Sequence, residues 1–183
     1  MTSHFKAVRL CVVPAILLLQ LLAFAVEKKP APAAPIPAQI TAAKRVFIAN
    51  AGGDQPFYED PLFSGGPDRA YNQFYAAMEA WGRYELVGAP HDADLVIEIL
   101  FSVPRIEQKV FRGQPLVVPI PYDPQFRVAI RDPKTNATLW VFTEHAEWAE
   151  LQRNREKNFD QALAKMVSNV QGLSGSTTSA SKP

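Results

Sequence analysis

Apolar residues recur at every second position in several short stretches of the chain, a pattern that predicts β-strands. The strongest of these stretches is 94–103, DLVIEILFSV, in which both faces are largely apolar. Because a strand that is apolar on both faces must be covered on both, we expect it near the centre of a sheet. Further strands are predicted at 45–50, 84–87, 126–131 and 139–145, the last two forming a hairpin across residues 132–137.

Two other stretches repeat apolar residues at helical spacing. The first begins after Asp68, a capping residue type, and ends at Gly82, which is placed for a left-handed cap. The second covers 154–171 and is expected to stop at Gly172, with Leu173 folding back on it. The apolar stripes are Tyr71, Phe74, Met78 and Trp81 in the first, and Phe159, Leu163, Met166 and Val170 in the second.

These elements follow one another as strand, helix, strand, strand, an irregular segment, strand, strand and helix. The irregular segment, 104–124, contains five prolines and is expected to fold back loosely around Arg112 to Gln114. For this order of elements, packing both helices on one face of the sheet buries the apolar faces of helices and sheet in two layers. The sequence therefore predicts an α+β fold, a two-layer sandwich of a mostly antiparallel mixed sheet with two helices on one face.

Residues 1–25 have the pattern of a secretory signal peptide. Lys6 and Arg9 precede an apolar run over 10–22, and Ala23-Phe24-Ala25 supplies a signal peptidase site before Val26. The apolar run is short for a membrane span, which needs roughly 20 residues. The alternative is an uncleaved segment, 10–26, that anchors the protein in the inner membrane.

The segments at the two ends of the mature chain are not expected to fold. Residues 26–43 are rich in proline and alanine, which favours an extended spacer. Residues 174–183, SGSTTSASKP, are small and polar and are predicted to be a disordered tail. A single domain over 44–173 remains.

Composition excludes several classes of protein. The sole cysteine, Cys11, lies in the signal segment, so the mature chain has no disulfide, thiolate metal site or cysteine nucleophile. Removing Lys6 and Arg9 leaves 17 basic residues against 18 acidic ones, a net charge of −1. Nothing in this balance indicates binding to nucleic acid.

A metal site is one candidate for chemistry. If the first and third strands were neighbours, the acidic residues of the loop after the first strand would lie close to the histidine and aspartates that precede the third. Carboxylate oxygens and an imidazole nitrogen are suitable ligands for a divalent metal ion. The spacing of these residues matches no known metal-binding loop. The alternative is that they are ordinary turn residues, among which aspartate is common. The residues concerned are Asp54, Glu59, Asp60, His91, Asp92 and Asp94.

A catalytic site is the second candidate. His145 lies near Glu144 and Glu147 and could serve as a general base, but the chain has neither an HExxH nor a GxSxG motif. We expect this histidine to be solvated. Glu98, the charge in the central strand, is expected to be exposed on the helix-free face or paired with Arg127 or Arg131 across the sheet.

An apolar patch is the strongest functional candidate. The aromatic residues of the last strand and of the loop after it alternate with a second row, so one row can remain exposed on the open face of the sheet. Together with the apolar part of the irregular segment, that row would suit a protein, peptide or lipid partner. The alternative is that this segment covers the aromatics. The residues are Leu116, Val118, Ile120, Trp140, Phe142 and Trp148.

Three phrases carry a resemblance to a known group. They are Ala93 to Glu98, Arg131 to Thr135 leading to Leu139 and Trp140, and the closing helix from Phe159 to Val170. The domain resembles small bacterial periplasmic proteins and lipoproteins similar to the amino-terminal domain of TolB and to curli-assembly lipoproteins. The resemblance implies envelope placement and no catalytic residues. The chain departs from the group in lacking a lipid-attachment cysteine after the apolar run.

The sequence therefore predicts a non-enzymatic binding or assembly protein of the cell envelope, periplasmic or secreted, with a protein or peptide partner and no cofactor. Two alternatives remain. One is a small exported metal-binding protein or hydrolase that uses Asp54, Asp60, His91 and Asp92. The other is an inner-membrane protein held by its uncleaved signal segment, which would be its only contact with the membrane.

Overall fold

The computed structural model describes residues 34–53, 62–106, 110–111, 114–115 and 122–175. None of the helices in these ranges combines the length and apolarity needed to cross a bilayer. In chain order the elements are α2 (Ala38–Ala42), β1 (Arg45–Asn50), α3 (Arg69–Trp81), β2 (Glu85–Leu86), the 3₁₀ turn η1 (Pro90–Asp92), β3 (Leu95–Ser102), β4 (Val110–Phe111), β5 (Gln114–Pro115), β6 (Gln125–Arg131), β7 (Thr138–His145) and α4 (Gln152–Gly175).

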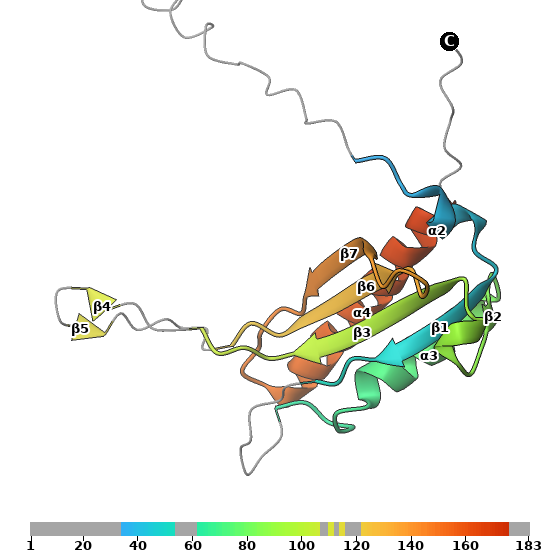
Figure 1. The fold of residues 1–183 in the computed structure, drawn as a ribbon. Coiled ribbons are helices and arrows are strands. Elements are labelled where there is room, and N and C mark those ends of the chain that lie inside the picture. The colour runs from blue at the N-terminus through green and yellow to red at the C-terminus, as the bar shows by residue number, and fades with distance from the viewer. Residues whose placement is uncertain (1–33, 54–61, 107–109, 112–113, 116–121, 176–183) are drawn as a thin grey trace, which may run out of the picture. The chain divides into compact units, whose positions relative to one another are not determined.

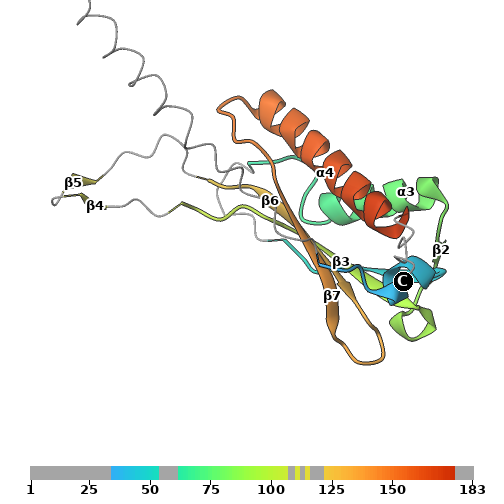
Figure 2. The same ribbon diagram turned by 90° about the horizontal axis from the view of Figure 1, so that it is seen from above.

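The main sheet has the strand order β2-β1-β3-β6-β7, with β3 at its centre as predicted (Figure 1). β1 runs parallel to both β2 and β3, whereas β6 runs antiparallel to both β3 and β7. Figure 2 shows α3 and α4 on the same face of this sheet. The predicted α+β two-layer sandwich with a mixed sheet is confirmed, but the sheet is not mostly antiparallel, because two of its four described pairings are parallel and two are antiparallel. A separate two-stranded hairpin, β4 with β5, also confirms the expected fold-back in the irregular segment.

The core lies between the sheet and the two helices. The four residues of β3 that share its inner face are each at most 2% exposed, while those of the other face are half-buried. Four phenylalanines meet at one end of this layer, with ring centroids 4.7 to 5.9 Å apart for most pairs. Burial of each such side chain contributes about 1.5–3 kcal/mol. The four are Phe63, Phe101, Phe126 and Phe159.

The register of β7 determines which of its faces meets the helices. Trp140 pairs with Ile130, and Phe142 pairs with Val128. Both β6 partners are fully buried in the core, and directly opposed residues share a face of the sheet. Trp140 and Phe142 therefore face the helix layer and are half-buried, and the open face carries the alternate row that includes Val141.

The folded part extends beyond the predicted domain limits at both ends. Within the segment predicted as a spacer, α2 forms and places Ile40, which is fully buried, in the core. The prediction that the last helix stops at Gly172 is wrong, because α4 continues to Gly175. The Tyr84 hydroxyl donates to the Ser174 hydroxyl over 2.6 Å, which ties this last turn to the residue just before β2.

The two ends of α3 differ in how well they match the prediction. Gly82 takes the left-handed conformation expected of its cap, with φ +67°. Asp68 occupies the N-cap position, but its side chain makes no capping hydrogen bond. Instead it accepts one from the Asn50 amide over 2.8 Å, and so ties the start of α3 to the end of β1.

Candidate functional site

The pairing of β1 with β2 is short and leaves part of the β1 edge open. The Glu85 N–H donates to the Lys44 carbonyl, and the Val87 N–H donates to the Val46 carbonyl over 3.0 Å. Main-chain groups alternate in direction along a strand, so those of Ile48 and Asn50 point to the same edge. Among the described residues, no strand pairs with β1 at this edge beyond Val46.

A groove of about 360 Å³ lies at this open stretch of β1. Its wall on the helix side is formed by residues one turn apart in α3, whose tyrosine rings are 6.0 Å apart. Both tyrosines are half-buried, with their bodies against the core. Val87 and Gly88, where the chain leaves β2, also line the groove. The groove is lined by Phe47, Ile48, Tyr71, Asn72, Tyr75, Val87 and Gly88.

These groups together suit an extended polypeptide. The free N–H and C=O groups of a strand edge pair with another backbone in the β conformation, and a neighbouring wall of side chains selects what that backbone carries. Tyrosine offers a large apolar body with a polar tip, which suits such a wall. No residue that lines the groove is charged, so it favours an uncharged segment.

Sequence reasoning did not identify this groove. The two tyrosines lie four residues apart on α3; helical periodicity assigns Tyr71 to the core stripe and gives Tyr75 no role. The available indication was the shortness of strand 84–87, followed at once by Gly88 and Pro90. A strand that ends so early beside a longer one must leave an open edge.

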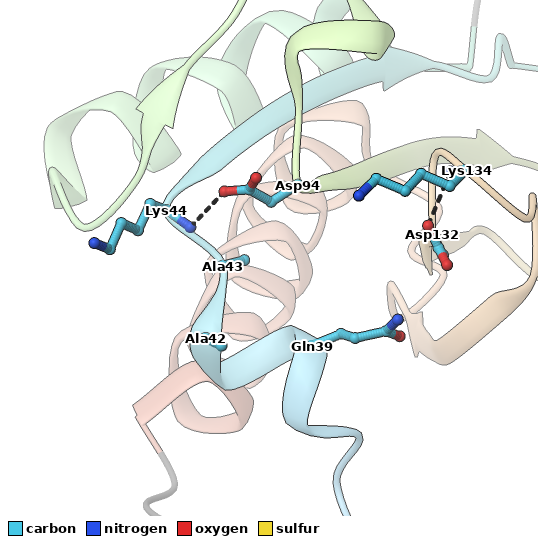
Figure 3. Close-up of a pocket in the computed structure, with 7 residues that line it drawn as sticks. All are labelled: Gln39, Ala42, Ala43, Lys44, Asp94, Asp132 and Lys134. Carbon is cyan, nitrogen blue, oxygen red and sulfur yellow. Dashed lines mark hydrogen bonds between the residues drawn. The ribbon is translucent and has the colours of Figure 1, made fainter.

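A second pocket, of about 320 Å³, lies where α2 meets β1 (Figure 3). One Asp94 carboxylate oxygen accepts the N–H groups of Arg45 and Lys44, over 2.9 and 3.0 Å, and these bonds lower the pKa of Asp94. The Lys134 N–H and the Thr135 hydroxyl likewise lower the pKa of Asp132. Both carboxylates hold backbone in place, so this pocket is a structural junction.

Three residues of the predicted metal site, Asp54, Glu59 and Asp60, lie outside the described ranges. His91 and Asp92 are exposed in η1, with Nε2 and Oδ2 3.5 Å apart. Within the described ranges, no three His, Cys, Asp or Glu residues are grouped to hold a metal ion. The metal site remains a prediction.

His145 has a partner that the sequence did not indicate. Its Nδ1 lies 2.7 Å from Oδ1 of Asp123, and its side chain is 59% exposed. The neighbouring Glu144 pairs instead with Lys165 of α4. Glu98 pairs with Arg131, Oε2 to Nε at 3.0 Å, which is one of the two predicted partners.

The predicted apolar patch is divided by the fold. Trp140 and Phe142 face the helix layer rather than the open face. Trp148 lies apart from them, with its ring 4.8 Å from that of Tyr122 and the Arg155 guanidinium 5.1 Å from its centroid. The remaining members, Leu116, Val118 and Ile120, lie outside the described residues.

No protein-family model matches the sequence, and no curated protein matches it significantly. Among solved structures, the chain is similar to a putative neuraminyllactose-binding hemagglutinin homolog from Helicobacter pylori, with TM-score 0.46 and 13% identity over 80% of this chain and 92% of that one. It is similar to a PelC dodecamer variant from Paraburkholderia phytofirmans, with TM-score 0.40 and 18% identity over 75% and 95%. An uncharacterized lipoprotein B from Nitrosomonas europaea gives TM-score 0.37 and 16% identity over 78% and 89%. Similarity at this level carries no inference about partners or activity.

Proposed function

We propose that this protein is an exported, non-enzymatic binding module of the bacterial cell envelope. It captures an uncharged, extended segment of a partner protein by adding that segment as a strand beside β1. The observation that carries the proposal is the open edge at Ile48 and Asn50, next to a wall formed by Tyr71 and Tyr75.

Export is supported by the sequence of residues 1–25, with its basic start, apolar run and small-residue cleavage site. The proline-rich stretch that follows would separate the folded domain from the membrane at which it emerges. A module of this kind needs only a rigid sheet edge and an accessible groove. In the described residues, β1 is paired with β2 only as far as Val46, and a groove of about 360 Å³ lies beside the open stretch.

Strand addition would proceed from main-chain hydrogen bonds to side-chain selection. The partner backbone would pair with the N–H and C=O groups of Ile48 and Asn50, each bond contributing about 1 kcal/mol net. Its alternate side chains would then point toward α3 and contact the two tyrosines. Main-chain pairing provides affinity for any extended segment, and the tyrosine wall provides preference for apolar or aromatic residues.

The test is photo-crosslinking in the native envelope with a photoreactive residue in place of Tyr75. We expect one defined crosslinked product, because position 75 lines the groove. The same residue in place of Lys157, exposed on α4, is the control and should give none.

A blocking variant distinguishes capture in the groove from chance proximity. No atom lies within 4 Å of a Cβ built on Gly88, so Gly88→Trp can fill the groove without disturbing the core. Gln73→Trp, exposed on α3 away from the groove, is the matched control. We expect the crosslink to disappear in the first variant and persist in the second. A crosslink that survives Gly88→Trp would overturn the proposal.

A further inference from the structure

β7 forms the opposite edge of the sheet, and no strand in the described part of the chain pairs with its outer side. The Ala146 N–H donates to the Pro124 carbonyl over 2.8 Å, so the main-chain groups of Ala146 point toward the β6 side. Alternation along the strand turns the N–H and C=O groups of Val141 and Thr143 outward. Among the described residues, β6 is the only strand that pairs with β7.

The middle of β7 lacks the features that usually prevent edge pairing. Protein edges are commonly protected by proline, lysine, bulges or inward-pointing charges. In β7 a register shift lies at one end, beside Leu139, and Glu144 lies at the other, paired with Lys165. The residues between them, 140–143, are aromatic or β-branched, and the Val141 side chain is 40% exposed. Aromatic and β-branched residues have high strand propensity, so this segment is suited to pairing with another strand.

We propose that β7 pairs antiparallel with β7 of a second copy of this chain, about a two-fold axis that passes through Val141 perpendicular to the sheet. This axis places the helices of both copies on the same side of the joined sheet. A residue on the helix face of one β7 therefore lies opposite a residue on the helix face of the other. The two sheets then join into one continuous sheet through an isologous contact. This interface lies on a different edge from the proposed groove and does not depend on it.

The side chains select this register. With the axis at Val141, Trp140 lies opposite the partner's Phe142 on the helix face, which is a favourable aromatic pair. The two valines oppose each other on the open face and exchange both of their main-chain hydrogen bonds. Moving the axis to Phe142 would place Trp140 opposite the partner's Glu144, whose carboxylate is already engaged by a lysine. The Val141 register is therefore the complementary one.

The first test is the molar mass of the purified protein by size-exclusion chromatography with light scattering, over a range of concentrations. We expect a dimer that becomes monomeric in Val141→Lys, because the substitution places two like charges directly opposite each other. Leu151→Lys is the matched control, since Leu151 is 63% exposed and lies outside β7, and it should remain dimeric. A wild-type protein that is monomeric throughout, or a dimer that persists in Val141→Lys, would overturn the proposal.

A second measurement does not depend on a destabilising charge. In the full chain with Cys11→Ser, the variant Val141→Cys carries a single thiol, and a short bis-maleimide should link two copies through it. Leu151→Cys in the same background should give no more product than random encounter. Equal crosslinking at the two positions would contradict a two-fold axis at Val141.

Discussion

Arg69 joins the two helices and the segment that precedes α3. Its guanidinium donates hydrogen bonds to the Glu156 carboxylate and, over 2.8 Å, to Asp160. It also lies 4.0 Å from the ring centroid of Phe159. Its side chain is only 13% exposed, so the charge requires these partners in order to remain buried. Glu156 in turn accepts the Ser64 N–H over 2.8 Å.

This network makes stability depend on pH through Glu156. Burial raises the pKa of Glu156, but the hydrogen bonds from Arg69 and Ser64 outweigh burial and hold it below its usual value of 4.5. The unfolded chain therefore binds the proton more readily than the folded one. The stabilisation is fully present above about pH 4.5 and is lost as the pH falls through the lower, folded pKa.

We expect Glu156→Gln to lower the free energy of unfolding at neutral pH by about 1–2 kcal/mol, allowing for its partial exposure. The variant should also lose less stability than wild type on acidification. Urea unfolding at neutral pH and near pH 3 measures both effects. Glu79→Gln, which alters an exposed carboxylate on α3, should behave as wild type. Parallel acid dependence in wild type and Glu156→Gln would contradict this role.

Single residues show where sequence reasoning ends. Glu98 could be assigned to Arg131 or Arg127 in advance, because neighbouring strands bring a limited set of charges within reach. The pairing of His145 with Asp123 could not, since Asp123 belongs to an irregular segment without periodicity. The Arg69 network joins residues 87 and 91 positions apart, and only the packing of α3 on α4 brings them together.

The two helix ends show how tertiary contacts override local preference. Gly82 ends α3 as its sequence suggests, with φ +67°. Gly172 has the same local appearance, yet α4 continues past it because Leu173 and Ser174 are buried against the core. A glycine after an apolar stripe predicts a helix end only when nothing beyond it can be buried.

Alanine at these two glycines should therefore have opposite effects. Gly82→Ala forces a side chain into the left-handed region and should cost about 1–2 kcal/mol. Gly172→Ala replaces a glycine inside a helix, where no atom lies within 4 Å of the new Cβ, and should stabilise by about 0.5–1 kcal/mol. Thermal or urea unfolding of both variants decides between these signs. A destabilised Gly172→Ala would indicate that α4 ends where the sequence first suggested.

β7 shows the same limit for strands. Alternation in 139–145 correctly predicts two rows of side chains, one of them aromatic. It does not say which row meets the helices, because a shift of one residue exchanges the faces. That choice is made by the pairing of Phe142 with Val128 and of Trp140 with Ile130. The aromatic row therefore packs against the edge of the core, and Val141 lies on the open face of the sheet.

At the scale of the whole molecule, periodicity was sufficient for the architecture. β3 is apolar on both faces and lies at the centre, and the two helical stripes cover one face of the sheet (Figure 2). The two sheet edges did not follow from periodicity, because an edge is defined by the absence of a further neighbour; the shortness of strand 84–87 was the one indication of an open edge. β2 is too short to cover β1, and β7 is the last strand in the order.

The two proposed interfaces should act independently. β1 and β7 are separated by β3 and β6, which corresponds to about 14 Å between strands. Substitutions at sites this far apart, with no shared partner, usually have additive effects. We therefore expect Val141→Lys to abolish the dimer and leave the crosslink from position 75 intact, and Gly88→Trp to do the reverse.

The double variant, Val141→Lys with Gly88→Trp, provides the stricter measurement. It should be monomeric and unable to form the crosslink, and each loss should be no larger than in the corresponding single variant. If Val141→Lys alone removed the crosslink, partner capture would require two copies of the groove in one dimer. Two grooves on one continuous sheet would then bind a partner through avidity rather than through one strong contact. If instead the crosslink is unchanged, a single groove is sufficient, and the dimer serves only to protect an exposed strand edge.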